Sequence, residues 1–194
     1  MTRASDLKGL WIDRADTGLI LIDAQVKLAG AMPQPVMERV LKNWLALVET
    51  AGRMKLPVAV SEQYPQGLGH VMPVLKEAVH RVMPPARWLE KIEFSCCESP
   101  LFEQFLQGGR RTWIVCGMET HICVYQTVRG LADRGFRVHV PVDAVVSRQK
   151  HNFKVGVDLM RRAGAVITST ETVLFDLLRR AQGDDFRTIS KLIK

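Results

Sequence analysis

Short apolar runs alternate along the chain with longer segments in which apolar residues recur every three or four positions. Runs that are apolar on both faces predict strands that are buried on both sides of a sheet. The run at 17–23 is the clearest of these, and the run at 88–91 is the weakest. The expected strands are 17–23, 57–60, 88–91, 112–116, 136–142 and 165–168.

Segments with helical spacing separate these runs. Within residues 33–51, apolar side chains recur on one face, and Gly52 ends the pattern. The segment 61–70 is rich in Gly, Pro and Gln and predicts a loop. Buried strands that alternate with helices indicate a parallel sheet covered by helices on both faces. The other expected helices are 100–107, 120–134, 152–163 and 170–181.

Composition fits one globular domain, because 194 residues, 47% of them hydrophobic, suffice for a sizeable core. We therefore expect a single domain spanning residues 1–194. No apolar stretch reaches the roughly 20 residues that a membrane span requires. Residues 1–16 mix charges throughout and lack the apolar region of a signal peptide. Four cysteines without CxxC spacing favour reduced thiols and a cytoplasmic location.

The net charge of +7 and the pI of about 9.5 raise the question of a nucleic-acid partner. The basic residues are scattered as doublets, such as Arg110-Arg111 and Arg161-Arg162. No run of basic residues is as long as a basic patch, which spans about five to eight residues. This pattern predicts a solvated surface and no nucleic-acid partner, with nucleic-acid binding kept as the weaker alternative.

Residues 117–123, with the sequence GMETHIC, join an expected strand to an expected helix. A cysteine placed where a helix begins feels the positive end of the helix dipole, which favours its thiolate. The unpaired N–H groups of the same turn can hold an oxyanion beside the sulfur. Cys123 is therefore a candidate nucleophile.

Asp23 and Lys91 each end an expected strand. Because reactive groups of parallel sheets gather at the carboxyl ends of the strands, we expect both side chains to lie beside Cys123. A carboxylate whose pKa is raised by burial can take the thiol proton and pass it to a leaving amine. The Lys91 ammonium would offset the negative charge of the acid and the thiolate.

These motifs, in this order, resemble those of the isochorismatase-like cysteine hydrolases, which include nicotinamidases and N-carbamoylsarcosine amidohydrolase. The resemblance rests on Asp23 after an apolar strand, on 91–95 (KIEFS) and on 117–123, and it extends over 17–186. The loop 61–69 (SEQYPQGLG) is most similar to the YcaC-like and isochorismatase domain-containing branch.

The resemblance implies a doubly wound three-layer α/β/α sandwich with a mostly parallel, about six-stranded sheet, assembled into homo-oligomers. It implies that Cys123 is the nucleophile, Asp23 the general base and Lys91 the third member of a triad. It also implies a cis peptide between Met118 and Glu119, whose N–H would join that of Cys123 in an oxyanion hole. The implied reaction cleaves a C–N bond of a small amide-like substrate through a thioester.

The chain departs from the metal-binding pattern of nicotinamidases. Those enzymes place Asp-x-His and a further His on the loop after the second strand, where this chain has Glu62, Tyr64 and His70. One histidine and one carboxylate do not form a convincing site for a divalent ion, so we expect no metal and no other cofactor. Isochorismatases proper cleave a vinyl ether without a nucleophilic cysteine, so Cys123 also argues against that activity.

The function expected from the sequence is therefore a metal-independent cysteine hydrolase with a small-molecule substrate and no membrane partner. Two alternatives stay open: a metal-assisted nicotinamidase, and a non-catalytic interaction protein that retains the pocket. The candidate substrate-binding residues are Gln63, Tyr64 and Thr120, with Tyr125 as a further possibility. The residues expected to be structural are Cys96, Cys97, Cys116 and His121.

Overall fold

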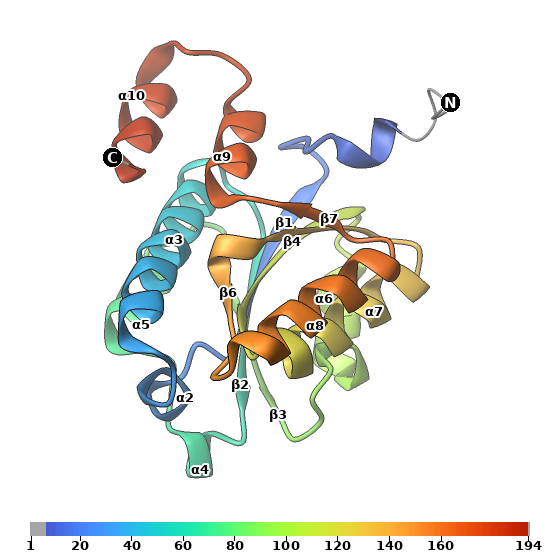
Figure 1. The fold of residues 1–194 in the computed structure, drawn as a ribbon. Helices are drawn as coiled ribbons and strands as arrows, with labels where there is room; N and C mark the ends of the chain where they lie inside the picture. The colour runs from blue at the N-terminus through green and yellow to red at the C-terminus, as the bar shows by residue number, and fades with distance from the viewer. Residues whose placement is uncertain (1–6, 194) are drawn as a thin grey trace.

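A seven-stranded, all-parallel sheet forms the centre of the protein (Figure 1). The computed structural model describes residues 7–193. Residues 1–6 and 194 lie outside the described residues. The predictions of a domain over residues 1–194 and of a charged N-terminal segment include these positions. The strands are β1 (Thr17–Ile22), β2 (Val58–Gln63), β3 (Arg87–Lys91), β4 (Thr112–Met118), β5 (Arg137–Pro141), β6 (Val145–Val146) and β7 (Val166–Thr168).

The strand order is β3-β2-β1-β4-β5-β7, with the two-residue β6 beside the end of β4. From β1 the chain builds the sheet outward to β3, then returns to β4 and builds it in the other direction. The expected doubly wound fold is therefore confirmed. The order reverses between β1 and β4, and in open α/β sheets ligands bind outside the carboxyl ends of the strands at such a reversal.

Helices cover both faces of the sheet, as expected for a three-layer sandwich (Figure 1). Leu19 and Leu21 of β1 face one core, which is closed by α3, α5, α9 and α10. Ile20 and Ile22 face the other core, closed by α6, α7 and α8. The helices are α2 (Val26–Gly30), α3 (Gln34–Arg53), α4 (Pro65–Leu68), α5 (Pro73–His80), α6 (Pro100–Leu106), α7 (Tyr125–Asp133), α8 (Lys150–Arg162), α9 (Thr170–Leu178) and α10 (Gly183–Leu192). The short turns are η1 (Lys8–Leu10), η2 (Cys96–Glu98), η3 (Thr120–Val124) and η4 (Val142–Ala144).

The six expected strands are all present, but several boundaries differ from the prediction. Residues 61–63, expected in a loop, continue β2 because they pair with β3. The expected helix 120–134 begins with a π-helical turn, η3, in which the Val124 N–H donates to the carbonyl of Glu119. The expected helix 170–181 ends at Leu178, because Arg179 adopts a left-handed conformation with φ 63°.

Four helices and one strand have no counterpart in the sequence-based prediction. They are short, as α2, α4, α5, α10 and β6 span between two and ten residues. Segments of this length carry less than the three or so turns of periodicity that identify an amphipathic helix. Within residues 7–193, no helix is both long and apolar enough to cross a membrane.

Candidate active site

Asp23 follows the last residue of β1 at the point where the strand order reverses. Its side chain is fully buried, and its backbone has φ 49°. Two bonds from Ser61 of β2 hold it: the Asp23 N–H donates to the Ser61 carbonyl at 3.1 Å, and the Ser61 hydroxyl donates to Oδ1 at 2.6 Å. The carboxylate therefore has one oxygen fixed by the sheet and the other available to Lys91.

Lys91, the last residue of β3, brings a buried ammonium to this carboxylate. Its Nζ donates to Asp23 Oδ2 at 2.8 Å and to Gln63 Oε1 at 2.7 Å, with only 1% of the side chain exposed. Burial by itself lowers the pKa of Lys91, but the negative charge of Asp23 and the hydrogen bond to it raise the pKa, and the net direction is upward. Lys91 is therefore an ammonium at neutral pH.

Gln63 links the ion pair to the sulfur. Its Oε1 accepts from Lys91 Nζ and lies 3.9 Å from Cys123 Sγ, while its Nε2 donates to the Ile92 carbonyl. Its backbone is bracketed by Gln25, whose amide accepts from the Gln63 N–H at 2.8 Å and donates to the Gln63 carbonyl at 3.0 Å. The side-chain amide of Gln63 is engaged by these protein partners, and its expected role in substrate binding stays a prediction.

Cys123 lies in the π-helical turn η3 with 6% of its surface exposed. Burial raises the pKa of the Cys123 thiol, and the negative charge of Asp23 raises it further, while the Lys91 ammonium offsets part of this effect. The direction of this shift runs against the expectation that the helix start favours a resting thiolate, because desolvation by burial is the largest effect on the Cys123 thiol. With its pKa raised, the sulfur rests as a neutral thiol near the Asp23 carboxylate.

Close packing around two glycines places η3, the turn that carries the candidate nucleophile Cys123 and is called the nucleophile turn below. Gly117 of β4 has φ 125°, and a Cβ there would lie 2.0 Å from the Ile22 carbonyl oxygen, so only glycine fits between β4 and β1. Gly156 lets α8 approach the turn closely in the same way, since a Cβ at this position would lie 2.9 Å from the backbone of His121. The strand end that precedes Cys123 is thus brought against the strand end that precedes Asp23.

Glu119 sits between β4 and the nucleophile turn. The peptide between Met118 and Glu119 is cis, as the resemblance implied. The Glu119 side chain is buried and binds Arg148, whose N–H donates to Oε2 at 3.0 Å and whose guanidinium lies 3.1 Å from Oε1. The Glu119 carboxylate is therefore paired with Arg148 and is not a candidate acid or base. The backbone N–H of Glu119 remains the candidate donor to an oxyanion.

The other candidate substrate-binding residues differ in exposure. Thr120 is fully buried, and its hydroxyl has no hydrogen-bond partner among residues 7–193. Tyr64 is 55% exposed at the start of α4, where its N–H donates to the Lys91 carbonyl. Tyr125 is half-buried and lies against the guanidinium of Arg129. Thr120 thus lies in the same turn as Cys123, and Tyr64 contacts the backbone of Lys91, but the binding role of both stays a prediction.

The loop that carries metal ligands in nicotinamidases is held by its own contacts here. Glu62 Oε2 lies 3.0 Å from His70 Nδ1, and Glu62 Oε1 accepts from the Val71 N–H at 2.7 Å. Across residues 7–193, no group of three His, Cys, Asp or Glu side chains is placed to hold a metal ion. The donor set that the loop presents is therefore one carboxylate and one histidine, which is too few for a divalent cation.

The remaining cysteines and His121 have structural surroundings. All four cysteines are free thiols and buried. Burial raises the pKa of Cys116 and of Cys96, and it raises that of Cys97 to about 11. His121 Nδ1 lies 3.0 Å from the hydroxyl of Ser147, so its ring has a polar partner outside the candidate site residues.

Sequence reasoning missed residues that surround Asp23, Lys91 and Cys123 in the structure, above all Ser61, Gln25 and Arg148. A signal for Ser61 and Gln63 exists, because polar residues at alternating positions of a strand share one face of the sheet. Gln25 carries no such signal, since its contact with β2 depends on how the chain turns after Asp23.

Comparison with known proteins agrees with this geometry. The family model of the isochorismatase domain matches residues 17–172. The chain therefore belongs to the isochorismatase family, a hydrolase superfamily. The secreted isochorismatase effector Isc1 of Phytophthora sojae is 34% identical over 179 residues, which cover 91% of this chain and 83% of that protein.

Two solved structures share the whole fold. MAR1 ribonuclease from Caenorhabditis elegans has a TM-score of 0.87 and 33% identity, covering 94% of this chain and 92% of that chain. The YcaC gene product of Escherichia coli, described as an octameric hydrolase of unknown specificity, has a TM-score of 0.86 and 23% identity, covering 94% and 90%. The expected YcaC-like branch is thereby confirmed at the level of fold.

Proposed function

We propose that this protein is a metal-independent cysteine hydrolase that cleaves a C–N bond of a small amide-like substrate. The observation that carries the proposal is the buried ammonium of Lys91, which binds both the Asp23 carboxylate at 2.8 Å and the Gln63 amide oxygen beside Cys123 Sγ. A buried ion pair is costly to desolvate, so its placement beside the Cys123 thiol favours a chemical role over a structural one.

The reaction begins with attack of Cys123 Sγ on the substrate carbonyl carbon, while the thiol proton passes to Asp23. A neutral resting thiol is suited to this step, because the proton is transferred as the S–C bond forms. The backbone N–H groups of Glu119 and Cys123 would stabilise the oxyanion. Collapse breaks the C–N bond, the amine leaves with the proton from Asp23, and water then hydrolyses the thioester to release the acid and restore the thiol.

We further propose that the protein acts as a homo-oligomer. The support is the octameric assembly named for the YcaC structure, which has the same fold. A cytoplasmic location also stays a prediction, and it rests on the four reduced cysteines of the chain.

The decisive experiment is turnover of a panel of primary amides, carbamoyl compounds and nicotinamide, with and without a chelator. Wild type, Cys123→Ala and the matched variant Cys116→Ala are compared, and intact-protein mass spectrometry looks for an acyl adduct. We expect chelator-resistant turnover, an adduct that maps to Cys123, and loss of both in Cys123→Ala alone. Retention of turnover by Cys123→Ala would overturn the proposal.

The same panel separates the alternatives. Chelator-sensitive release of ammonia from nicotinamide would indicate the metal-assisted nicotinamidase. No turnover of any compound, with equal binding of a protein partner by wild type and Cys123→Ala, would indicate a non-catalytic interaction protein. Because the C. elegans structure is described as a ribonuclease and this chain carries a net charge of +7, single-stranded RNA is included as a substrate. RNA cleavage that survives in Cys123→Ala would replace the amide proposal.

A further inference from the structure

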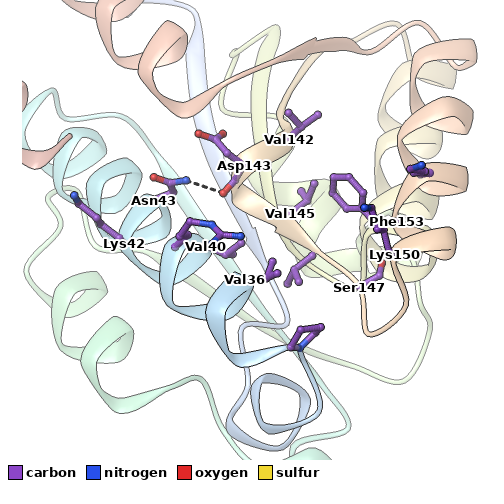
Figure 2. Close-up of a pocket in the computed structure, with 14 residues that line it drawn as sticks. Val36, Val40, Lys42, Asn43, Val142, Asp143, Val145, Ser147, Lys150 and Phe153 are labelled. Atoms are coloured by element: carbon purple, nitrogen blue, oxygen red, sulfur yellow. Dashed lines mark hydrogen bonds between the residues drawn. The ribbon is translucent and has the colours of Figure 1, made fainter. Parts of the chain in front are cut away.

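A large groove lies between α3 and α8, and residues of β6 line it (Figure 2). Its volume is about 910 Å³. Ligand sites of small molecules span roughly 300–1,000 Å³, so the groove is large enough for an organic molecule of considerable size. None of Asp23, Lys91 and Cys123 lines it, and it is therefore separate from the triad.

The interior of the groove is apolar. Val36 and Val40 come from α3, Val145 comes from β6, and Phe153 comes from α8 (Figure 2). Val36 and Phe153 are only half-buried, so part of their apolar surface remains in contact with water. An apolar ligand body would remove this surface from water, at roughly 25 cal/mol per Å².

The rim of the groove is basic. Arg39 of α3 and Lys150 and Lys154 of α8 are exposed and line it. None of these three cations has an ion pair or a side-chain hydrogen bond within the part of the chain that the structure describes. Because α8 begins at Lys150, the positive end of its helix dipole lies at the same rim.

The carboxylate in the groove, Asp143, has a structural partner. Its Oδ1 accepts from the N–H of Thr170 at 2.8 Å and from the Thr170 hydroxyl at 3.0 Å, which fixes the start of α9. Its carbonyl accepts from Asn43 Nδ2 at 2.7 Å (Figure 2). The acid is therefore held toward α9, and the charge that the rim presents to a ligand is positive.

We propose that this groove binds an organic anion with an apolar body, such as a carboxylate on an acyl chain. The apolar interior takes the body, and Arg39, Lys150 and Lys154 take the anionic group. A nucleic-acid backbone fits less well, because the interior offers a single aromatic side chain, Phe153, and mostly aliphatic surface. The site is independent of the proposed hydrolysis.

The test uses the full protein and isothermal titration with decanoate, with 1-decanol as the uncharged analogue. We expect decanoate to bind more tightly than decanol, with an affinity that falls as ionic strength rises. Lys150→Glu/Lys154→Glu should weaken decanoate binding roughly tenfold or more, because two attractive surface charges become repulsive. Lys150→Arg/Lys154→Arg should keep the affinity. Lys76→Glu/Lys191→Glu, with the same change in net charge at exposed positions elsewhere, should also keep it.

Several outcomes would overturn the site. Equal affinity for decanoate and decanol would show that the cations take no part. Unchanged binding in Lys150→Glu/Lys154→Glu would place the ligand elsewhere. Absence of binding, together with a change of oligomeric mass in that variant, would show that a second copy of the chain covers the groove. Tighter binding of an RNA oligonucleotide that displaces decanoate would assign the rim to nucleic acid. Cys123→Ala should bind decanoate as wild type does, so failure of the hydrolase proposal leaves this one testable.

Discussion

Asp23 combines full burial with a backbone conformation that non-glycine residues rarely adopt. Its φ of 49° lies in the left-handed region. The two bonds from Ser61 hold this conformation, and such conformations tend to occur at functional sites. The turn directs Oδ2 toward Lys91 at the end of β3, so the position of the acid depends on its local backbone as well as on the sheet.

The charge of Asp23 controls the ionisation of Cys123. We expect Asp23→Asn to lower the pKa of the Cys123 thiol, because Asp23 raises that pKa while Lys91 lowers it. Alkylation of Cys123 by iodoacetamide at pH 7 to 8 should therefore be faster in Asp23→Asn than in wild type. Hydrolysis should nevertheless fall about 10²- to 10⁴-fold, because the general base is lost.

Peptide mapping after timed alkylation measures this effect at each cysteine. Cys116, which is fully buried in β4, serves as the internal control and should react more slowly than Cys123 in both proteins. Slower alkylation of Cys123 in Asp23→Asn would contradict the inference that the charge of Asp23 disfavours the Cys123 thiolate.

Gln63 sets the position of Lys91 relative to the sulfur. Gln63→Glu would add a negative charge beside Cys123 Sγ and Lys91 Nζ without a change in size. We expect the pH dependence of Cys123 alkylation to shift to higher pH, since a nearby anion disfavours the thiolate. Gln63→Leu, which removes the acceptor without adding charge, is the comparison. Identical pH profiles for wild type and Gln63→Glu would rule out this positioning role.

The elements of the sheet could be predicted from the sequence where their residues are apolar on both faces. The run that became β1 is buried at every position, so its pattern identified a central parallel strand. The two residues of β6 gave no such pattern, because Val145 and Val146 join the sheet only through their contact with the end of β4. Tertiary context, which the local sequence does not contain, decides short elements of this kind.

The same distinction holds for the site. Asp23, Lys91 and Cys123 could be placed together because each lies at or just beyond the carboxyl end of a strand of a parallel sheet. The ionisation of Cys123 could not be predicted, since desolvation of the sulfur depends on how the core closed by α6, α7 and α8 packs around it. The bridging contact of Gln63 likewise depends on three segments that meet only in the folded chain.

Packing of α8 against η3 gives a prediction at the level of elements. Gly156→Ala would place a methyl group 2.9 Å from the backbone of His121 and Thr120, so the nucleophile turn must move. Misplacement by about 1 Å can cost roughly 100-fold in rate. We expect Cys123 alkylation and hydrolysis to fall far more than the thermal stability, because alanine also favours the helix.

Gly30→Ala is the matched control, since no atom lies within 4 Å of the added methyl group. Tm and the alkylation rate are measured for both variants. A Gly156→Ala protein that alkylates at the wild-type rate would show that the turn tolerates displacement, and that α8 does not position the nucleophile.

At the scale of the whole molecule, the sheet carries one buried histidine whose ionisation is coupled to folding. His139 of β5 is 1% exposed, and its Nε2 has no hydrogen-bond partner among the described residues. Burial lowers the pKa of His139 to about 4, although the carboxylate of Asp176 partly opposes this shift. The folded protein thus keeps His139 neutral at a pH where an exposed histidine is already protonated.

This difference makes stability depend on pH in a defined window. As the pH falls below the ordinary value of about 6.5, the unfolded chain takes up a proton on His139 and the folded protein does not, so the free energy of unfolding decreases. The loss continues until the folded pKa of about 4 is reached and then stops. At about 1.4 kcal/mol per pKa unit, His139 alone accounts for a loss of roughly 3 kcal/mol between neutral pH and pH 4.

His139→Leu should remove this part of the pH dependence while leaving stability at neutral pH equal or higher, because a buried polar atom without a partner is replaced by an apolar group. Urea unfolding at intervals between pH 7 and pH 4 measures the slope for wild type and for His139→Leu. The exposed His151 offers the control His151→Gln, which should retain the wild-type slope. Parallel curves for wild type and His139→Leu across this range would mean that His139 is protonated equally in the folded and unfolded chains. Because the carboxylates of the chain titrate in all three proteins, the difference between the curves isolates the histidine.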